Sequence, residues 1–102
     1  MDLTKAIHRA HTDTALFMTS DIRGEALKSG WSKDVVKSMR VVHRDGEYAV
    51  QFPESVADKA WVHEYGDPDN TPTAVIRKYD TSSPRAQDFL SERFNHHLGG
   101  GI

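Results

Sequence analysis

The sequence has no cysteine among its 102 residues, and this absence excludes disulfides, thiolate nucleophiles and thiolate metal sites. Small secreted domains often depend on disulfides, so the absence favours folding in the cytosol. The sequence also lacks any stretch near the roughly 20 apolar residues that span a bilayer, and it begins without the apolar run of a signal peptide. We therefore expect no contact with a membrane.

A strong excess of charge of one sign is lacking as well. Thirteen basic and fifteen acidic residues give a formal net charge of −2, whereas a dedicated nucleic-acid binder neutralises phosphates with a basic surface. At this length the chain has room for one domain with a modest core. We predict a single α+β domain over residues 1–98 and a flexible glycine-rich tail over residues 99–102.

Two segments carry the apolar spacing of helices. The range Asp2–Lys28 places apolar residues on one face, and Gly30 follows as a stop signal. Gly24 interrupts the pattern, so a bend or an end there is an open alternative. A terminal helix starts with Ser83 as its cap and Pro84 at its first position, and the glycine triplet ends it. The expected buried faces consist of Leu3, Ile7, Ala10, Thr14, Phe17, Met18 and Ile22 in the first helix and of Ala86, Phe89, Leu90, Phe94 and Leu98 in the last.

Asp45-Gly46 is the strongest hairpin signal in the chain. Apolar and polar residues alternate on both sides of it, which predicts a β-hairpin over roughly Lys37–Phe52. Thr73–Tyr79 is rich in β-branched residues and predicts another strand. Between them, Glu54–Tyr65 has helical spacing, with an irregular connection as the alternative, and Gly66–Pro72 is a loop on composition. The sum is an α+β fold with a small antiparallel sheet backed by helices.

The histidines supply the nearest approach to a catalytic or metal site. His63-Glu64 is like the start of the zinc-protease signature, but Asp67 stands where the second histidine is needed, beyond a glycine at which a helix is not expected to persist. His8 and His11 lie three residues apart and lack an obvious third metal ligand. His96-His97 are interpreted as surface residues near a helix C-terminus. We therefore predict no enzyme activity, no cofactor and no metal.

Four features occur in an order that resembles a known family: Ser29-Gly30-Trp31, the hairpin, the segment Ala60–Gly66 and the proline-bearing loop that follows. This order is similar to that of the small neck and tail-completion proteins of tailed bacteriophages. In that family an aromatic-rich segment ends in a hydrophobic residue, any residue, glutamate, an aromatic residue and glycine, here Val62-His63-Glu64-Tyr65-Gly66. The match runs from about Ser29 to Leu98. The chain departs from the family at Ser82–Arg85, where a proline-phenylalanine-like segment is common, so tail completion, tail terminator and head closure all stay open.

The resemblance implies a structural virion protein of the neck or upper tail. It implies a ring of six copies between head connector and tail tube, with heterologous contacts between copies. Such a protein is assembled in the host cytoplasm and resides in the virion, with connector and tail proteins as partners and DNA passing through the lumen. The residues themselves leave two other classes open, a small cytosolic binding or regulatory module and an enzyme with an unrecognised site.

The residues singled out for the fold or for an interface have physical roles of their own. Glu64 is expected to accept hydrogen bonds from loop amides, and Gly66 permits a backbone turn closed to other residues. Trp61 is expected in the core, with an interface as the alternative. Contacts with other subunits are expected from the first helix, the hairpin and the Gly66–Thr73 loop. The full set is Gly30, Trp31, Trp61, His63, Glu64, Tyr65, Gly66, Pro68 and Pro72.

Overall fold

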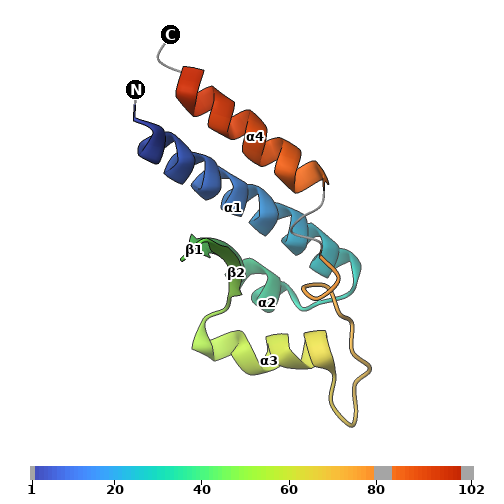
Figure 1. Cartoon of the computed structure of the whole chain (residues 1–102). Helices are drawn as coiled ribbons and strands as arrows, with labels where there is room; N and C mark the ends of the chain where they lie inside the picture. Colours follow the sequence, from blue (N-terminus) through green and yellow to red (C-terminus); the bar gives the residue numbers. More distant parts are fainter. Residues whose placement is uncertain (1, 80–83, 100–102) are drawn as a thin grey trace.

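A computed structural model of the chain describes residues 2–79 and 84–99 (Figure 1). The order of its elements confirms the predicted α+β class, with a long N-terminal helix, a two-stranded antiparallel hairpin and a C-terminal helix. The predicted cap Ser83 and most of the predicted tail lie outside the described residues. The elements are α1 (Leu3–Lys28), α2 (Lys33–Ser38), β1 (Arg40–Arg44), β2 (Glu47–Gln51), α3 (Glu54–Tyr65) and α4 (Pro84–Gly99).

The helix α1 is the central element of the fold, and the other elements lie on either side of it. In Figure 1, α4 lies alongside it, and the hairpin, α2 and α3 lie on its other side. The main core forms between α1, α2 and β1, where Met18, Ile22, Val35 and Met39 are fully buried. The molecule is elongated, with extents of 56 × 26 × 21 Å. No helix in the described part of the chain is long and apolar enough to cross a membrane.

The start and course of α1 follow from its sequence, but its buried face differs from the prediction. The Asp2 side chain caps the helix by accepting a hydrogen bond from the Lys5 amide at 3.1 Å. The helix runs on through Gly24, so neither a break nor an end occurs there. The predicted burial of Leu3 and Ile7 is wrong, since both are exposed. The predicted burial of Ala10, Thr14, Met18 and Ile22 is confirmed, and alanine and threonine side chains on the same face let neighbouring elements approach closely. The buried residues are Ala6, Ala10, Thr14, Ala15, Met18, Thr19, Ile22 and Ala26.

The end of α1 is built around Gly30, as predicted. Gly30 has a φ of 89°, the left-handed region that favours glycine. Its amide donates to the carbonyl of Leu27 at 3.1 Å, and the Trp31 amide donates to the carbonyl of Ala26 at 3.0 Å. These two bonds form a Schellman motif, which satisfies the last carbonyl groups of the helix. The motif also turns Trp31 back into the core, where it is 3% exposed.

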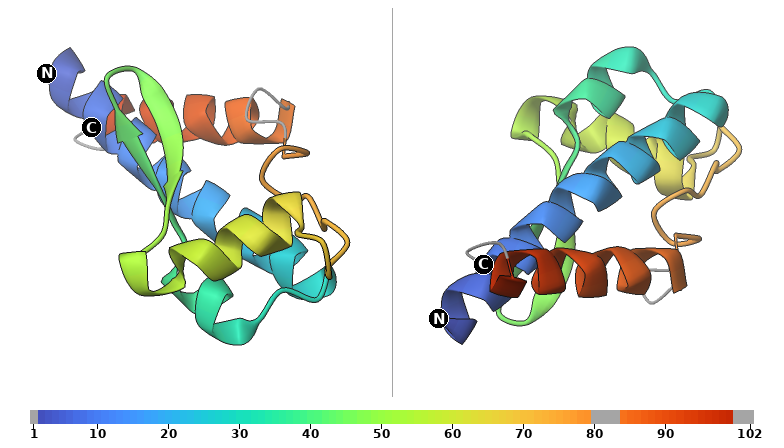
Figure 2. Two further views of the ribbon diagram at one scale, coloured as in Figure 1. Left: turned by 90° about the horizontal axis from the view of Figure 1, so that it is seen from below. Right: turned by 90° about the horizontal axis from the view of Figure 1, so that it is seen from above.

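The hairpin is confirmed, and one of its edges is attached to α1. Asp45 and Gly46 have φ values of 52° and 79°, the left-handed pair of a two-residue turn that matches the twist of the strands. β1 and β2 pair without interruption from Arg44–Glu47 to Arg40–Gln51. On the far edge of β1, the Val41 amide donates to the Thr19 hydroxyl of α1 at 2.8 Å. The hairpin therefore lies across α1, as Figure 2 shows.

The predicted strand Thr73–Tyr79 is wrong. The Tyr79 amide donates to the carbonyls of Val75 and Ile76 at 3.0 and 3.1 Å, which makes this stretch a turn. The amides of residues 75–77 are bound by the side chain of Glu64 and so cannot join a sheet ladder. In the described residues the sheet has two strands only.

Candidate functional site

Glu64 anchors the segment that follows α3. Its side chain is buried, and its Oε1 accepts hydrogen bonds from the amides of Val75 and Ile76, each at 2.8 Å. Its Oε2 accepts from the amide of Arg77 at 3.0 Å and from the Nε of the same residue at 2.9 Å. The Arg77 guanidinium also donates to the Glu64 carbonyl at 2.7 Å. The prediction that this carboxylate accepts hydrogen bonds from loop amides is confirmed.

The ionisation of Glu64 follows from these contacts. Burial alone would raise the pKa of the carboxyl group, because it penalises the charged form. The three amide donors and the Arg77 guanidinium outweigh burial and hold the pKa of Glu64 below its ordinary value. Glu64 is therefore a buried, charged carboxylate. The amides and the guanidinium that contact it compensate its charge, as a buried charge requires.

Gly66 makes the turn that lets the loop return to Glu64. Its φ of 78° and ψ of 178° lie in a region that is essentially restricted to glycine. A Cβ atom at this position would lie 2.7 Å from the carbonyl oxygen of Asn70 and 2.8 Å from the Cδ of Pro72. Beyond the turn, Asp67 and Asn70 exchange backbone hydrogen bonds at 3.1 and 3.2 Å. The loop is therefore closed by hydrogen bonds between its own residues and has a defined conformation.

Trp31 and His63 hold the base of the same loop. Their rings stack with centroids 5.1 Å apart and an interplanar angle of 14°. The Trp31 indole N–H donates to the carbonyl of Thr73 at 3.0 Å, and the Thr73 amide donates to the carbonyl of His63 at 2.7 Å. The His63 Nε2 accepts from the amide of Ser32 at 3.2 Å. His63 therefore has a structural role in the link between α2, α3 and the loop.

Trp61 and Tyr65 form an exposed aromatic pair on the outer face of α3. The predicted burial of Trp61 is wrong, since it is 62% exposed. The reason is that α3 buries Val56, Ala60 and Glu64, and Trp61 lies one residue off that face. The two aromatic rings are 4.3 Å apart, and the Arg77 guanidinium lies 4.4 Å from the centre of the Tyr65 ring. This aromatic–cation stack, hereafter the α3 stack, consists of Trp61, Tyr65 and Arg77.

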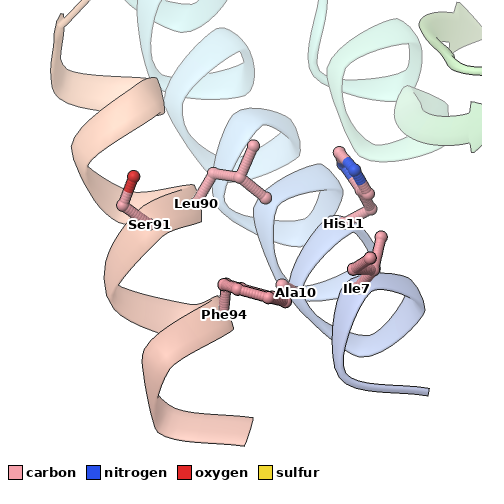
Figure 3. A pocket seen from close by; sticks show the side chains of 6 residues that line it. All are labelled: Ile7, Ala10, His11, Leu90, Ser91 and Phe94. Carbon is pink, nitrogen blue, oxygen red and sulfur yellow. The ribbon is translucent and has the colours of Figure 1, made fainter. Parts of the chain in front are cut away.

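A second exposed apolar feature lies between α1 and α4. It is an open pocket of about 270 Å³ near the start of α1. Figure 3 shows Leu90 and Phe94 pointing from α4 toward α1, with Ala10 facing them. Its lining is mostly apolar, which suits contact with another apolar side chain more than a polar ligand. The lining residues are Ile7, Ala10, His11, Leu90, Ser91 and Phe94.

His11 belongs to a contact with the hairpin. Its ring stacks on that of His43 at 3.9 Å with an interplanar angle of 1°, and its Nδ1 lies 2.6 Å from the Tyr48 hydroxyl. Burial, followed by the proximity of His43 and His8, lowers the pKa of His11 and so favours the neutral ring. Within residues 2–79 and 84–99, no three histidine or carboxylate side chains are arranged to hold a metal ion.

Asp13 joins α1 to α4. Its Oδ2 lies 2.7 Å from the Nε2 of His97 and 2.8 Å from the Nε of Arg93. The hydrogen bond from His97, together with that from Arg93, holds the pKa of Asp13 below its ordinary value against a smaller opposing effect of burial. The interpretation of His96-His97 as surface residues is therefore wrong for His97, whose side chain is largely buried in this contact.

The predicted site residues fall into two groups. One group forms the link between α1, α3 and the loop, and the other is exposed beside it. Arg77 and the Asp13 contact were not predicted, because their partners lie 13 to 84 residues away along the chain and no local spacing signals them. Gly30, Trp31, His63, Glu64, Gly66 and Pro72 are in the first group, and Trp61, Tyr65 and Pro68 are in the second.

Comparison of the chain with protein-family models, curated proteins and solved structures finds no match.

Proposed function

We propose that the protein is a structural subunit of the neck or upper tail of a tailed bacteriophage, in which several copies assemble with connector and tail proteins. Gly30-Trp31 and Val62–Gly66 lie in two of the four features whose order carries the resemblance that suggests this function. In the fold these residues support one another, since Trp31 stacks on His63 and Glu64 fixes the segment that Gly66 turns back. The residues that carry the resemblance thus act as a scaffold for a presented loop.

The observation that carries the proposal is the open shape of the chain. Its radius of gyration is 15.7 Å, whereas a compact domain of 100 residues has about 13 Å. In the described part of the chain, large apolar side chains remain exposed on α1 and α3, and contact with a neighbour would remove their apolar surface from water. A subunit that completes its packing against neighbours has this character. The exposed residues are Leu3, Ile7, Leu16, Leu27, Trp61 and Tyr65.

The α3 stack is the part of this surface best suited to a specific contact. Tryptophan, tyrosine and arginine are the residue types enriched at the energetic centres of interfaces. The buried Glu64 holds the stack in place. Its carboxylate is bonded to the Arg77 guanidinium, and Tyr65 is the next residue on the same helix. A preorganised aromatic surface loses little side-chain entropy on binding. We place the contact with a neighbouring subunit or tail protein here, beside Pro68 and Pro72 of the loop.

Replacement of Trp61 by alanine is expected to weaken assembly without unfolding the chain. The side chain is exposed, so its loss should change the free energy of unfolding by less than about 0.5 kcal/mol. At an interface centre the same truncation costs about 2 kcal/mol or more, at least a 30-fold rise in the dissociation constant. Light scattering of the purified protein, alone and with connector and tail proteins, measures the effect.

Lys59→Ala is the matched control, because Lys59 lies on the opposite side of α3 and makes only an exposed ion pair with Asp34. It should assemble as the unmodified chain does. Equal assembly of the Trp61→Ala and Lys59→Ala proteins would remove the α3 stack from the interface. Failure of the unmodified chain to associate with itself or with virion proteins would contradict the proposed function as a whole.

A further inference from the structure

The hairpin leaves one edge of its sheet open. A two-residue turn makes Arg44 and Glu47 the first hydrogen-bonded pair of the ladder, so alternate residues of β2 direct their backbone groups away from β1. These residues are Tyr48 and Val50. In the described part of the chain their backbone N–H and C=O groups have no hydrogen-bond partner. β1 is also the only described element that packs extensively along β2.

The corresponding edge of β1 is already occupied. The Val41 amide donates to Thr19, and the Met39 carbonyl just before the strand accepts from the Arg23 guanidinium at 2.8 Å, with both partners on α1. The packing of α1 along β1 therefore leaves β2 as the edge that is open to a second copy.

Apart from its short length, β2 lacks the features by which proteins keep an edge strand from pairing. It contains no lysine and no proline, and its register with β1 has no bulge. Its single charge, Glu47, stands at the end next to the turn. A two-stranded sheet is marginal by itself, and three or more strands make a stable unit.

We propose that two copies of the chain pair through β2, antiparallel, to form a four-stranded sheet across a two-fold axis. With Ala49 opposite its counterpart, Tyr48 faces Val50 and Glu47 faces Gln51 of the second copy. An aromatic residue opposite a β-branched residue is a favourable cross-strand pair, and glutamate opposite glutamine avoids facing like charges. A register or direction that places Glu47 opposite its own counterpart loses that advantage, so the sequence of β2 selects this pairing.

This contact goes beyond the proposed function and differs from it in kind. A two-fold contact uses the same strand on both copies and closes at two, whereas the ring implied by the resemblance uses two different surfaces. It rests on the open edge alone and requires no virion partner. The free subunit is then a dimer in which the edge is protected before any larger assembly forms.

A single introduced cysteine tests the register, because the natural chain has none. Ala49 is exposed, so Ala49→Cys leaves the packing of the hairpin intact. Opposite residues at a position without ladder hydrogen bonds have Cα atoms about 4.5 Å apart, within the range of about 4.4–6.8 Å that a disulfide accepts. Mild oxidation of the full chain should convert Ala49→Cys to a covalent dimer, which intact mass and non-reducing electrophoresis detect.

Two further cysteine variants fix the direction of the strands. Glu47→Cys and Gln51→Cys should each form no covalent dimer when oxidised alone, and a mixture of the two should form a disulfide-linked mixed dimer. Parallel or unspecific association would link each variant to itself. Circular dichroism that matches the natural chain shows that each variant is folded.

Ala49→Lys provides an independent measurement without cross-linking. Two lysines would face each other across the axis, which should raise the dimer dissociation constant about threefold or more. Ala57→Lys adds the same charge at an exposed alanine of α3 and should leave the constant unchanged. Failure of Ala49→Cys to cross-link, or self-linking of Glu47→Cys at an equal rate, overturns the proposal. Either result leaves the association with connector and tail proteins to be decided by its own measurement.

Discussion

Replacement of Glu64 by alanine is expected to lower the free energy of unfolding by about 3 kcal/mol and to release the segment around residues 75–77. The change removes the acceptor of three backbone amides and leaves the Arg77 guanidinium without its partner. The half-exposed guanidinium regains water, so most of the loss comes from the buried amides. Urea unfolding measures the total, and faster hydrogen exchange at Val75 and Ile76 locates it. Asp58→Ala, an exposed carboxylate on the same helix, should change stability by less than about 0.5 kcal/mol.

Acid provides a second test of the same anchor. The folded-state pKa of Glu64 lies below its ordinary value. The contribution of the ionised group is therefore fully present above the unfolded pKa of about 4.3 and is lost as the pH falls through the folded pKa. Glu64→Gln cannot titrate at this position, so the stability difference between it and the natural chain should shrink in acid. A difference that stays constant from neutral pH to pH values below the folded pKa would show that the carboxylate charge contributes nothing.

Replacement of Gly66 by alanine is expected to cost about 3 kcal/mol. The backbone conformation at this position is strained for any residue with a Cβ, and the added atom meets the Asn70 carbonyl and Pro72 at less than 3 Å. Relief requires the loop to move away from α3, which also strains the bonds to Glu64. Thermal unfolding should show the loss as a lower melting temperature, by about 4–8 °C for each kcal/mol in a domain of this size.

Gly24 is the matched control for this substitution. It lies inside α1, where an added Cβ has nothing within 4 Å. Gly24→Ala should therefore stabilise the chain by about 0.5–1 kcal/mol, because alanine is the better helix former. If both alanine variants unfold at the same temperature as the natural chain, the turn at Gly66 does not hold the loop in the manner described.

Local signals predicted much of the fold. The stop at Gly30 and the turn at Asp45-Gly46 each depend on a few adjacent residues, and both are present. The role of Glu64 as an acceptor for loop amides was also predictable, because a carboxylate and a following glycine are what such a turn requires.

The errors come from contacts between distant residues. Trp61 was expected in the core because apolar spacing places it near Val56 and Ala60. A buried carboxylate on α3 instead selects the face through Glu64, and the tryptophan turns outward. The expected strand at residues 73–79 fails for the same reason, since its amides bind that carboxylate.

The mass of the purified chain in solution is the most direct measurement of the proposed assembly. Light scattering at micromolar concentration, with and without the connector and tail proteins of the proposed virion, reports how many 11.5 kDa chains associate. We expect a complex of several chains that gains further mass when those proteins are added. A chain that gains no mass from them, whether it is an 11.5 kDa monomer or a dimer by itself, would contradict the proposed role as an assembly subunit.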